Sequence, residues 1–378
     1  MFRRLKLLSL SVVVVLALAG CFETQTVVDE GLIYSVGNGN IEIKPRLKYE
    51  LMLSLHVLRT AEDHHQLFIP WAQEMRQSLS EETLQQATTL ADTYHESQLA
   101  SILADYVGED SIEGITAYIE ADRGGKLKQA ASWKRRALQV AFDIEPHEIG
   151  AFAADFFRRY YDEGFGKLWE QEHKQLVHSD AEQMAKELET LDFSITKYME
   201  QFTGRKFDNS SKIILYPSSF SRPQHAYGFS ENGVKVFLYK VDKGITSVIA
   251  SGFHELLHSL IDGWEKPQRI KKHIETLAKQ ELFEKTCQEL KKSYGYPVGP
   301  LEEQLVHSMA RYMLYKKGYI DEKQTRRGSY GPYEDALYDV LFDKYDSFDN
   351  VDDFIYYALS NIKVVGESKA ARFEYIKQ

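Results

Sequence analysis

The chain has 378 residues and a formal net charge of −10, and no stretch of it is rich in lysine or arginine. An acidic surface does not suit a phosphate backbone, so nucleic acid is excluded as a partner. The length is sufficient for about two domains. Only two cysteines are present, Cys21 and Cys287.

Residues 1–20 are predicted to be a targeting segment that takes no part in the fold. Three basic residues (Arg3, Arg4 and Lys6) precede an apolar stretch that is too short to span a bilayer comfortably. The run Leu18-Ala19-Gly20-Cys21 resembles the bacterial lipobox, which implies cleavage before Cys21 and lipidation of that cysteine. An ordinary secretory signal followed by a chance cysteine is the alternative.

A lipobox implies that the protein resides in a bacterial cell envelope, anchored to a membrane through Cys21. Lys6 stands where a twin-arginine signal has an apolar residue, so a Sec-type signal is expected. By analogy with lipoprotein sorting, Phe22 favours the outer membrane of a Gram-negative cell over the outer leaflet of a single-membrane cell. Without residues 1–20 the net charge is −13, and the remaining Cys287, which is expected to be incidental, has no partner for an intramolecular disulfide.

Residues 21–46 are predicted to form a tether followed by a β-hairpin. Two apolar runs, over 32–36 and 41–43, flank Gly37-Asn38-Gly39-Asn40, which is a strong turn sequence. Residues 47–205 are predicted to be helical, and their aromatic stripes are expected to pack in a core. Three histidines without a partner at ligand spacing are expected on the surface: His64, His65 and His173.

Residues 206–378 are predicted to contain strands followed by an apolar helix. Residues 213–216 and 234–239 have strand patterns, the second after an Asn232-Gly233 turn, and both edge and central positions in a sheet are compatible with them. The helix contains Phe253-His254-Glu255-Leu256-Leu257-His258, an HExxH motif. Gly263 is its expected C-cap.

The HExxH motif combines two metal ligands with a general base. Residues four apart share one face of a helix, so His254 and His258 can direct two imidazoles at one cation. In proteins with this motif the glutamate, here Glu255, takes a proton from the attacking water. Alternatively, His254 and His258 are packed or solvated helix residues without a metal, and Glu255 is a surface charge. Against this, the polar residues of this otherwise apolar helix stand at the positions that a metal site requires.

A catalytic zinc site needs a third protein ligand. The third histidine of an HExxHxxGxxH motif is missing, which disfavours metzincins, so a carboxylate on a later helix is expected. A helical pattern over 301–313 contains two adjacent glutamates. Glu303 is favoured because His307 lies one turn later on the same face, where it can orient a ligand, and Glu302 is the alternative.

The HExxH motif, followed 45 residues after His258 by Glu303, resembles the gluzincin metallopeptidases. The arrangement over residues 190–330 is similar to that of poorly characterised bacterial lipoproteins with predicted metallopeptidase domains. The resemblance implies a zinc-dependent peptidase acting on a peptide or protein, with His254, His258 and Glu303 as ligands and Glu255 as base. The implied fold is α+β and predominantly helical, with a helical N-terminal region and a zincin-like catalytic domain over 206–378 that has a small mixed sheet ahead of the HExxH helix.

The sequence departs from this family next to the third ligand. Many gluzincins have an aspartate four residues after the ligand glutamate, bonded to a zinc-bound histidine, whereas His307 stands there in this chain. Asp262, one turn after His258, is the candidate replacement. Such peptidases also stabilise the oxyanion of the reaction with a tyrosine, histidine or arginine. The candidates are His307, Arg311, Tyr312, Tyr330 and Tyr333.

Two other functions stay open at this point. A non-catalytic anchored scaffold or binding protein would keep the metal but lack a substrate cleft. A cell-wall amide hydrolase would apply the same chemistry to a bond outside proteins. The sequence makes no prediction of the oligomeric state.

Overall fold

The computed structural model describes residues 33–36, 41–63, 69–93, 103, 106, 108–121, 139, 142–145, 147–207, 213–220, 227–231, 234–281, 283–284, 297–327 and 332–362. The predicted targeting segment and Cys21 lie outside the described residues, as do the turns at 37–40 and 232–233, His64, His65, Cys287 and Tyr330. The described part is predominantly helical with a small mixed sheet, which confirms the predicted α+β class.

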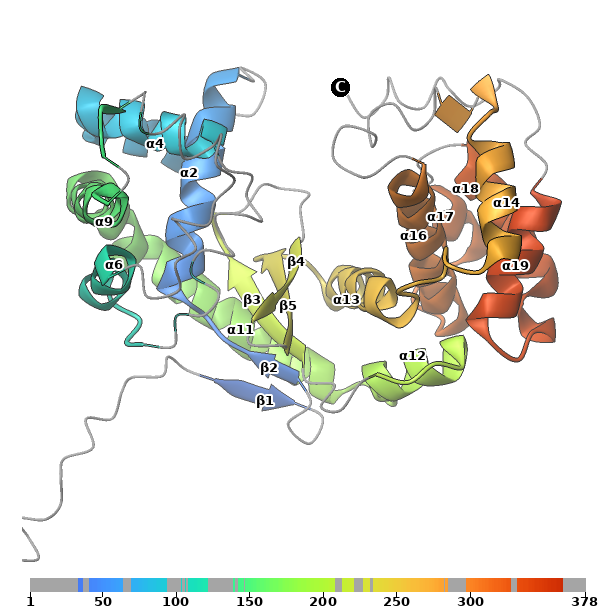
Figure 1. Ribbon diagram of the computed structural model, residues 1–378. Coiled ribbons are helices and arrows are strands. Elements are labelled where there is room, and N and C mark those ends of the chain that lie inside the picture. Colours follow the sequence, from blue (N-terminus) through green and yellow to red (C-terminus); the bar gives the residue numbers. More distant parts are fainter. Residues whose placement is uncertain are drawn as a thin grey trace, which may run out of the picture.

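A five-stranded mixed sheet lies in the middle of the molecule, in the order β1-β2-β3-β5-β4 (Figure 1). Its strands are β1 (Tyr34–Val36), β2 (Ile41–Ile43), β3 (Ile213–Ser218), β4 (Tyr227–Glu231) and β5 (Val234–Lys240). Strands β2, β3 and β5 are parallel, and β1 and β4 are antiparallel strands at the two edges. The predicted hairpin and the two predicted strands are confirmed. The edge strand β4 was not indicated by the sequence patterns.

The central strands are buried on both faces, as expected for parallel strands with continuous apolar sequence. On one face, Ile213 and Leu215 of β3 belong to the same core as α11 (Lys174–Glu189) and α13 (Ile245–Leu260). On the other, Ile214 and Tyr216 pack with Tyr49 of α2 (Leu47–Asp63). The sheet therefore connects two helical regions of the chain.

The N-terminal helices lie on one side of the sheet and share a second hydrophobic core (Figure 1). After α2 they are α3 (Pro70–Ser78), α4 (Glu81–Thr93), α6 (Ile112–Ala121) and α9 (Ile149–Tyr160). Helix α9 continues without a break into α11 through two π-helical segments, η1 (Tyr161–Phe165) and η2 (Trp169–His173), separated by α10 (Gly166–Leu168). The predicted packing of the aromatic stripe is confirmed, since Phe156 and Tyr160 are fully buried.

The expectation that His173 lies on the surface is wrong. The last residue of η2 points into the second core, where the ring of His173 stacks on Phe220 with 4.0 Å between ring centroids. Burial, followed by the nearby charge of Lys240, lowers the pKa of His173 to about 4. The histidine is thus a neutral core residue at physiological pH.

The C-terminal helices lie on the other side, and α13 runs between them and the sheet (Figure 1). They are α12 (Ile195–Thr203), α14 (Gln268–Leu277), α16 (Val298–Lys316), α17 (Glu322–Arg327), α18 (Pro332–Lys344), η3 (Tyr345–Ser347) and α19 (Val351–Asn361). Helix α13 ends at Leu260, and Gly263 adopts a left-handed conformation (φ 75°) in the turn beyond it, not at the C-cap itself. The predicted domain boundaries at residues 46 and 205 stay predictions.

Candidate metal centre

Helix α13 is amphipathic around the HExxH motif. Its apolar side, which includes Phe253, Leu256 and Leu257, is buried in the core shared with the sheet. The side chains of His254 and His258 are 19% and 25% exposed, so they lie at the border of the protein interior. Burial of the apolar side fixes the helix and thereby directs both imidazoles to the same side.

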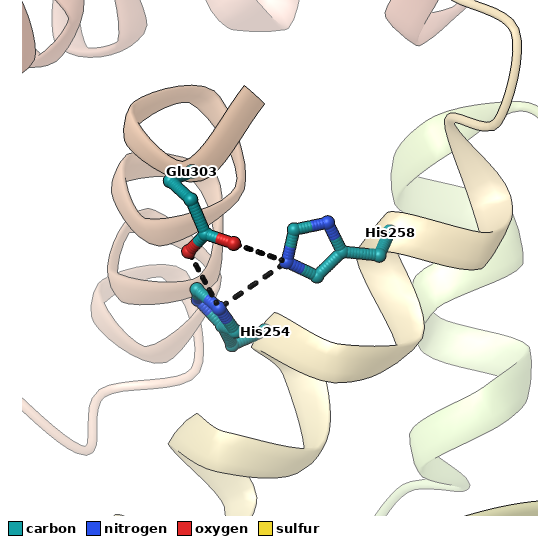
Figure 2. A group of neighbouring side chains, drawn as sticks. All are labelled: His254, His258 and Glu303. Carbon is teal, nitrogen blue, oxygen red and sulfur yellow. Dashed lines mark hydrogen bonds and ion pairs between the residues drawn. The ribbon is translucent and has the colours of Figure 1, made fainter. Parts of the chain in front are cut away.

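Helix α16 places Glu303 opposite these two histidines (Figure 2). The two Nε2 atoms of His254 and His258 are 3.3 Å apart. Glu303 Oε2 lies 3.4 Å from Nε2 of His254, and Glu303 Oε1 lies 3.4 Å from Nε2 of His258. The three side chains form the only group of this kind among the residues that the structure describes.

The three side chains could hold a metal ion, and their donor types are compatible with zinc. Zinc bonds of about 2.0–2.1 Å to nitrogen and oxygen, at tetrahedral angles, separate neighbouring donor atoms by roughly 3.3–3.4 Å. Two imidazoles and one carboxylate are also a donor set that catalytic zinc sites use. The three side chains together could therefore hold a metal ion.

Glu302 contacts His258 from the side away from the three donor atoms. Its Oε1 lies 2.8 Å from Nδ1 of His258, and its Oε2 accepts a hydrogen bond of 3.1 Å from the indole N–H of Trp264. A carboxylate at Nδ1 fixes the tautomer and the orientation of a ligand histidine. Burial lowers the pKa of His258, but the hydrogen bond to Glu302 and the charge of Glu303 outweigh it, so that the pKa is raised.

The structure therefore distinguishes the two adjacent glutamates. Glu303 joins the two histidines in the group that could hold a metal ion, and Glu302, the alternative ligand, contacts Nδ1 of His258 instead. The expected role of Asp262 is corrected by this arrangement. Because α13 ends at Leu260, Asp262 lies beyond the helix with its side chain exposed, and Glu302 occupies the position at His258 that was expected for Asp262.

The side chain of Glu255 lies directly against the edge strand β4. A methyl group added at Gly228 would be 2.0 Å from Glu255 Oε2 and 2.5 Å from its Cδ. Only a residue without a side chain leaves room for the carboxylate in this position. The general-base candidate is thus held between the helix that carries the two histidines and the edge of the sheet.

His307 also borders the group, but it does not take part in it. Its ring centroid is 6.2 Å from that of His254, and its Nδ1 lies 2.5 Å from Oε1 of Glu334 on α18. Glu334 also accepts a hydrogen bond of 2.7 Å from the hydroxyl of Tyr338. Sequence reasoning singled out His307 but missed Glu334 and Tyr338, because no local spacing links α16 to α18.

The other oxyanion candidates in the described residues are engaged elsewhere. The guanidinium of Arg311 donates to the backbone carbonyls of Gln324 and Thr325 on α17. Tyr333 is fully buried and donates its hydroxyl hydrogen to Gln280. Tyr312 is buried among aromatic rings, including those of Phe342 and Tyr345.

Comparison with known proteins adds no family. No protein-family model matches this chain, and no curated protein or solved structure matches it. Within the described residues, no helix combines the length and apolar character that crossing a membrane requires.

Proposed function

We propose that the chain is a zinc-dependent metallopeptidase of the gluzincin type, anchored in a bacterial cell envelope through a lipid on Cys21. The observation that supports this most directly is the convergence of His254, His258 and Glu303, whose ligand atoms all lie within 4.8 Å of one another. The two Nε2 atoms are 3.3 Å apart, and each lies 3.4 Å from a different carboxylate oxygen of Glu303. A glutamate follows the first histidine immediately, as hydrolysis by an HExxH site requires.

The residues of the site divide the reaction between them. A bound zinc ion would polarise the scissile carbonyl and lower the pKa of the attacking water to about 7. Glu255 accepts the proton that this water loses and passes it to the leaving amine. His254, His258 and Glu303 hold the metal, and Glu302 keeps the ring of His258 in its productive orientation.

The position of β4 favours a peptide as the substrate. This strand is at the edge of the sheet, and its Gly228 touches Glu255. An extended peptide can add to an edge strand through backbone hydrogen bonds. A peptide paired with β4 would pass beside the general base, which supports a peptidase more than a hydrolase of other amides.

The proposal is tested by measuring zinc content and cleavage of a peptide library with the purified protein and two variants. We expect one zinc per chain in the wild type and in Glu255→Gln, with turnover of the variant lower by at least about 10²–10⁴-fold, the usual contribution of a general base. His258→Ala should lose both zinc and activity. His147→Ala, which changes an exposed histidine far from the motif in sequence, should alter neither.

The outcomes separate the competing functions. Stoichiometric zinc without cleavage of any peptide supports the scaffold or binding protein. Release of amino groups from purified peptidoglycan, without peptide cleavage, supports the cell-wall amide hydrolase. Absence of zinc uptake by the reconstituted wild type overturns the metal site, and full activity of Glu255→Gln overturns the assignment of the base.

A further inference from the structure

The turn that follows α13 carries a buried tryptophan, Trp264. The helix ends at Leu260, and the backbone N–H of Trp264 donates to the carbonyl of Ile261 at 2.9 Å. The Trp264 side chain is 2% exposed and belongs to the same core as the apolar side of α13. This tryptophan therefore has a fixed position shortly after His258 in the chain.

Arg205 holds this turn from outside the helix. Its Nη1 donates to the backbone carbonyl of Leu260 at 2.7 Å and to that of Asp262 at 3.2 Å. Its Nε and Nη2 donate to the carboxylate of Asp352 on α19, at 3.2 Å and 2.5 Å. The last carbonyls of a helix lack partners within the helix, and a positive charge is favourable there. The turn is thus anchored both to the end of α13 and to α19.

The indole N–H of Trp264 reaches α16. A buried N–H is costly unless it has an acceptor, and here it donates to Oε2 of Glu302 at 3.1 Å. The other oxygen of the same carboxylate, Oε1, lies 2.8 Å from Nδ1 of His258. Each oxygen of Glu302 therefore meets a different side chain of the segment 258–264.

Two contacts restrict this carboxylate more than one contact does. The Glu302 side chain is 27% exposed, so packing alone does not fix it. A glutamate side chain has several rotatable bonds, and ordering it costs conformational entropy. The indole N–H selects the orientation in which Oε1 faces His258, because Oε2 is already bound to Trp264.

We propose that Trp264 is a positioning residue of the metal centre, which holds the carboxylate of Glu302 and through it the ring of His258. The ring then keeps its Nε2 beside Nε2 of His254 and the carboxylate of Glu303. A carboxylate at the far nitrogen of a ligand histidine fixes the orientation of that histidine. This role rests on the proposed function, since it concerns the same metal.

The test is a double-mutant cycle on zinc affinity in the full-length protein, measured by competition with a chromogenic chelator. Trp264→Phe keeps an aromatic ring but lacks the N–H, and we expect zinc affinity to fall by about 10-fold, the lower end of the usual effect of losing such a partner. In the background of Glu302→Ala the indole has no carboxylate to hold. There Trp264→Phe should change zinc affinity by no more than about twofold, as expected for sites that do not interact.

Two further variants separate the hydrogen bond from packing. Trp169→Phe is the matched control, because Trp169 is 3% exposed and belongs to the second core. It should lower the stability of the protein without changing zinc affinity. Replacing Trp264 with 3-benzothienylalanine, which has sulfur in place of the N–H, keeps the size of the ring system. This replacement should reproduce the loss of zinc affinity, and it decides the question if circular dichroism shows that Trp264→Phe does not fold.

The possible results separate this role from the proposed function. Wild-type zinc affinity in the benzothienylalanine variant overturns the role of Trp264 and leaves the metal site and the peptidase standing. An equal loss of affinity in the presence and absence of the Glu302 carboxylate makes Trp264 a packing residue and also overturns the role. Absence of zinc uptake by the wild type overturns the proposed function together with this role.

Discussion

At the scale of single residues, the site shows how two neighbouring glutamates on one helix take different roles. Successive residues on a helix differ by about 100° in direction, so adjacent side chains cannot approach a cation in the same way. Glu303 points toward Nε2 of His254 and of His258, while Glu302 reaches Nδ1 of His258 and the indole N–H of Trp264. The proposed ligand Glu303 and the carboxylate that contacts the proposed ligand His258 are therefore consecutive in the sequence.

Replacing Glu302 tests this division. Glu302→Gln keeps the shape of the side chain but removes the charge next to Nδ1 of His258, so we expect zinc affinity to fall by about 10–100-fold, the usual effect of losing a group that orients a ligand. Competition with a chromogenic chelator measures the change. Asp262→Asn is the matched control, because this exposed aspartate lies one turn beyond His258 and should not affect zinc affinity. The reverse pattern would restore Asp262 as the partner of His258.

At the scale of elements, β4 limits the space that is available to Glu255. The Cβ of an alanine at position 228 would lie 2.0 Å from Glu255 Oε2, so the carboxylate has to move. A misplacement of about 1 Å can reduce a rate by about 100-fold, and we expect a loss of this size in kcat for Gly228→Ala. Zinc content should stay at one per chain, because none of the three ligands is displaced.

Gly252→Ala is the control for this prediction. Gly252 lies on α13, two residues before His254, and a methyl group there would meet nothing within 4 Å. Alanine is favoured over glycine inside a helix by about 1 kcal/mol, so this variant should keep its activity and unfold at a slightly higher temperature. Equal activities of the two alanine variants would show that β4 does not constrain Glu255.

Much of the site could be predicted from the sequence, because it depends on helical spacing. The positions of His254, Glu255 and His258 follow from the period of α13. Glu303, which was preferred because of the face that it shares with His307, lies beside the two histidines in the structure. The role of Glu302, the strand β4 and the contact of His307 with Glu334 depend on how separate elements pack. No pattern within one segment contains that information, and Asp262 was misassigned because the end of α13 at Leu260 was not predicted.

At the scale of the whole molecule, Glu50 connects the N-terminal helices to the sheet. This residue of α2 is fully buried, and its Oε2 accepts hydrogen bonds from the backbone N–H of Ser219 (3.1 Å), the hydroxyl of Ser219 (2.8 Å) and the backbone N–H of Phe220 (3.1 Å). Burial raises the pKa of Glu50 to about 7, and the hydrogen bonds oppose this rise only in part. The connection therefore contains a carboxyl group that is protonated more readily in the folded state than in the unfolded state.

This difference in pKa predicts a dependence of stability on pH. The unfolded chain loses the proton of Glu50 near pH 4.5 and the folded chain near pH 7, so the folded state binds more protons between these values. The contribution of Glu50 to the free energy of unfolding is fully present below pH 4.5 and declines as the pH rises, by about 3 kcal/mol once the pH exceeds the folded pKa.

Glu50→Gln cannot titrate, so its free energy of unfolding relative to the wild type should rise by about this amount between pH 4.5 and pH 8. Urea unfolding of both proteins at several pH values measures the difference, and titrating groups that do not interact with Glu50, the proposed zinc site included, contribute equally to the two curves. A difference between the two proteins that stays constant over this range would mean that Glu50 is ionised in the folded state at all these pH values, paired with the donors of Ser219 and Phe220.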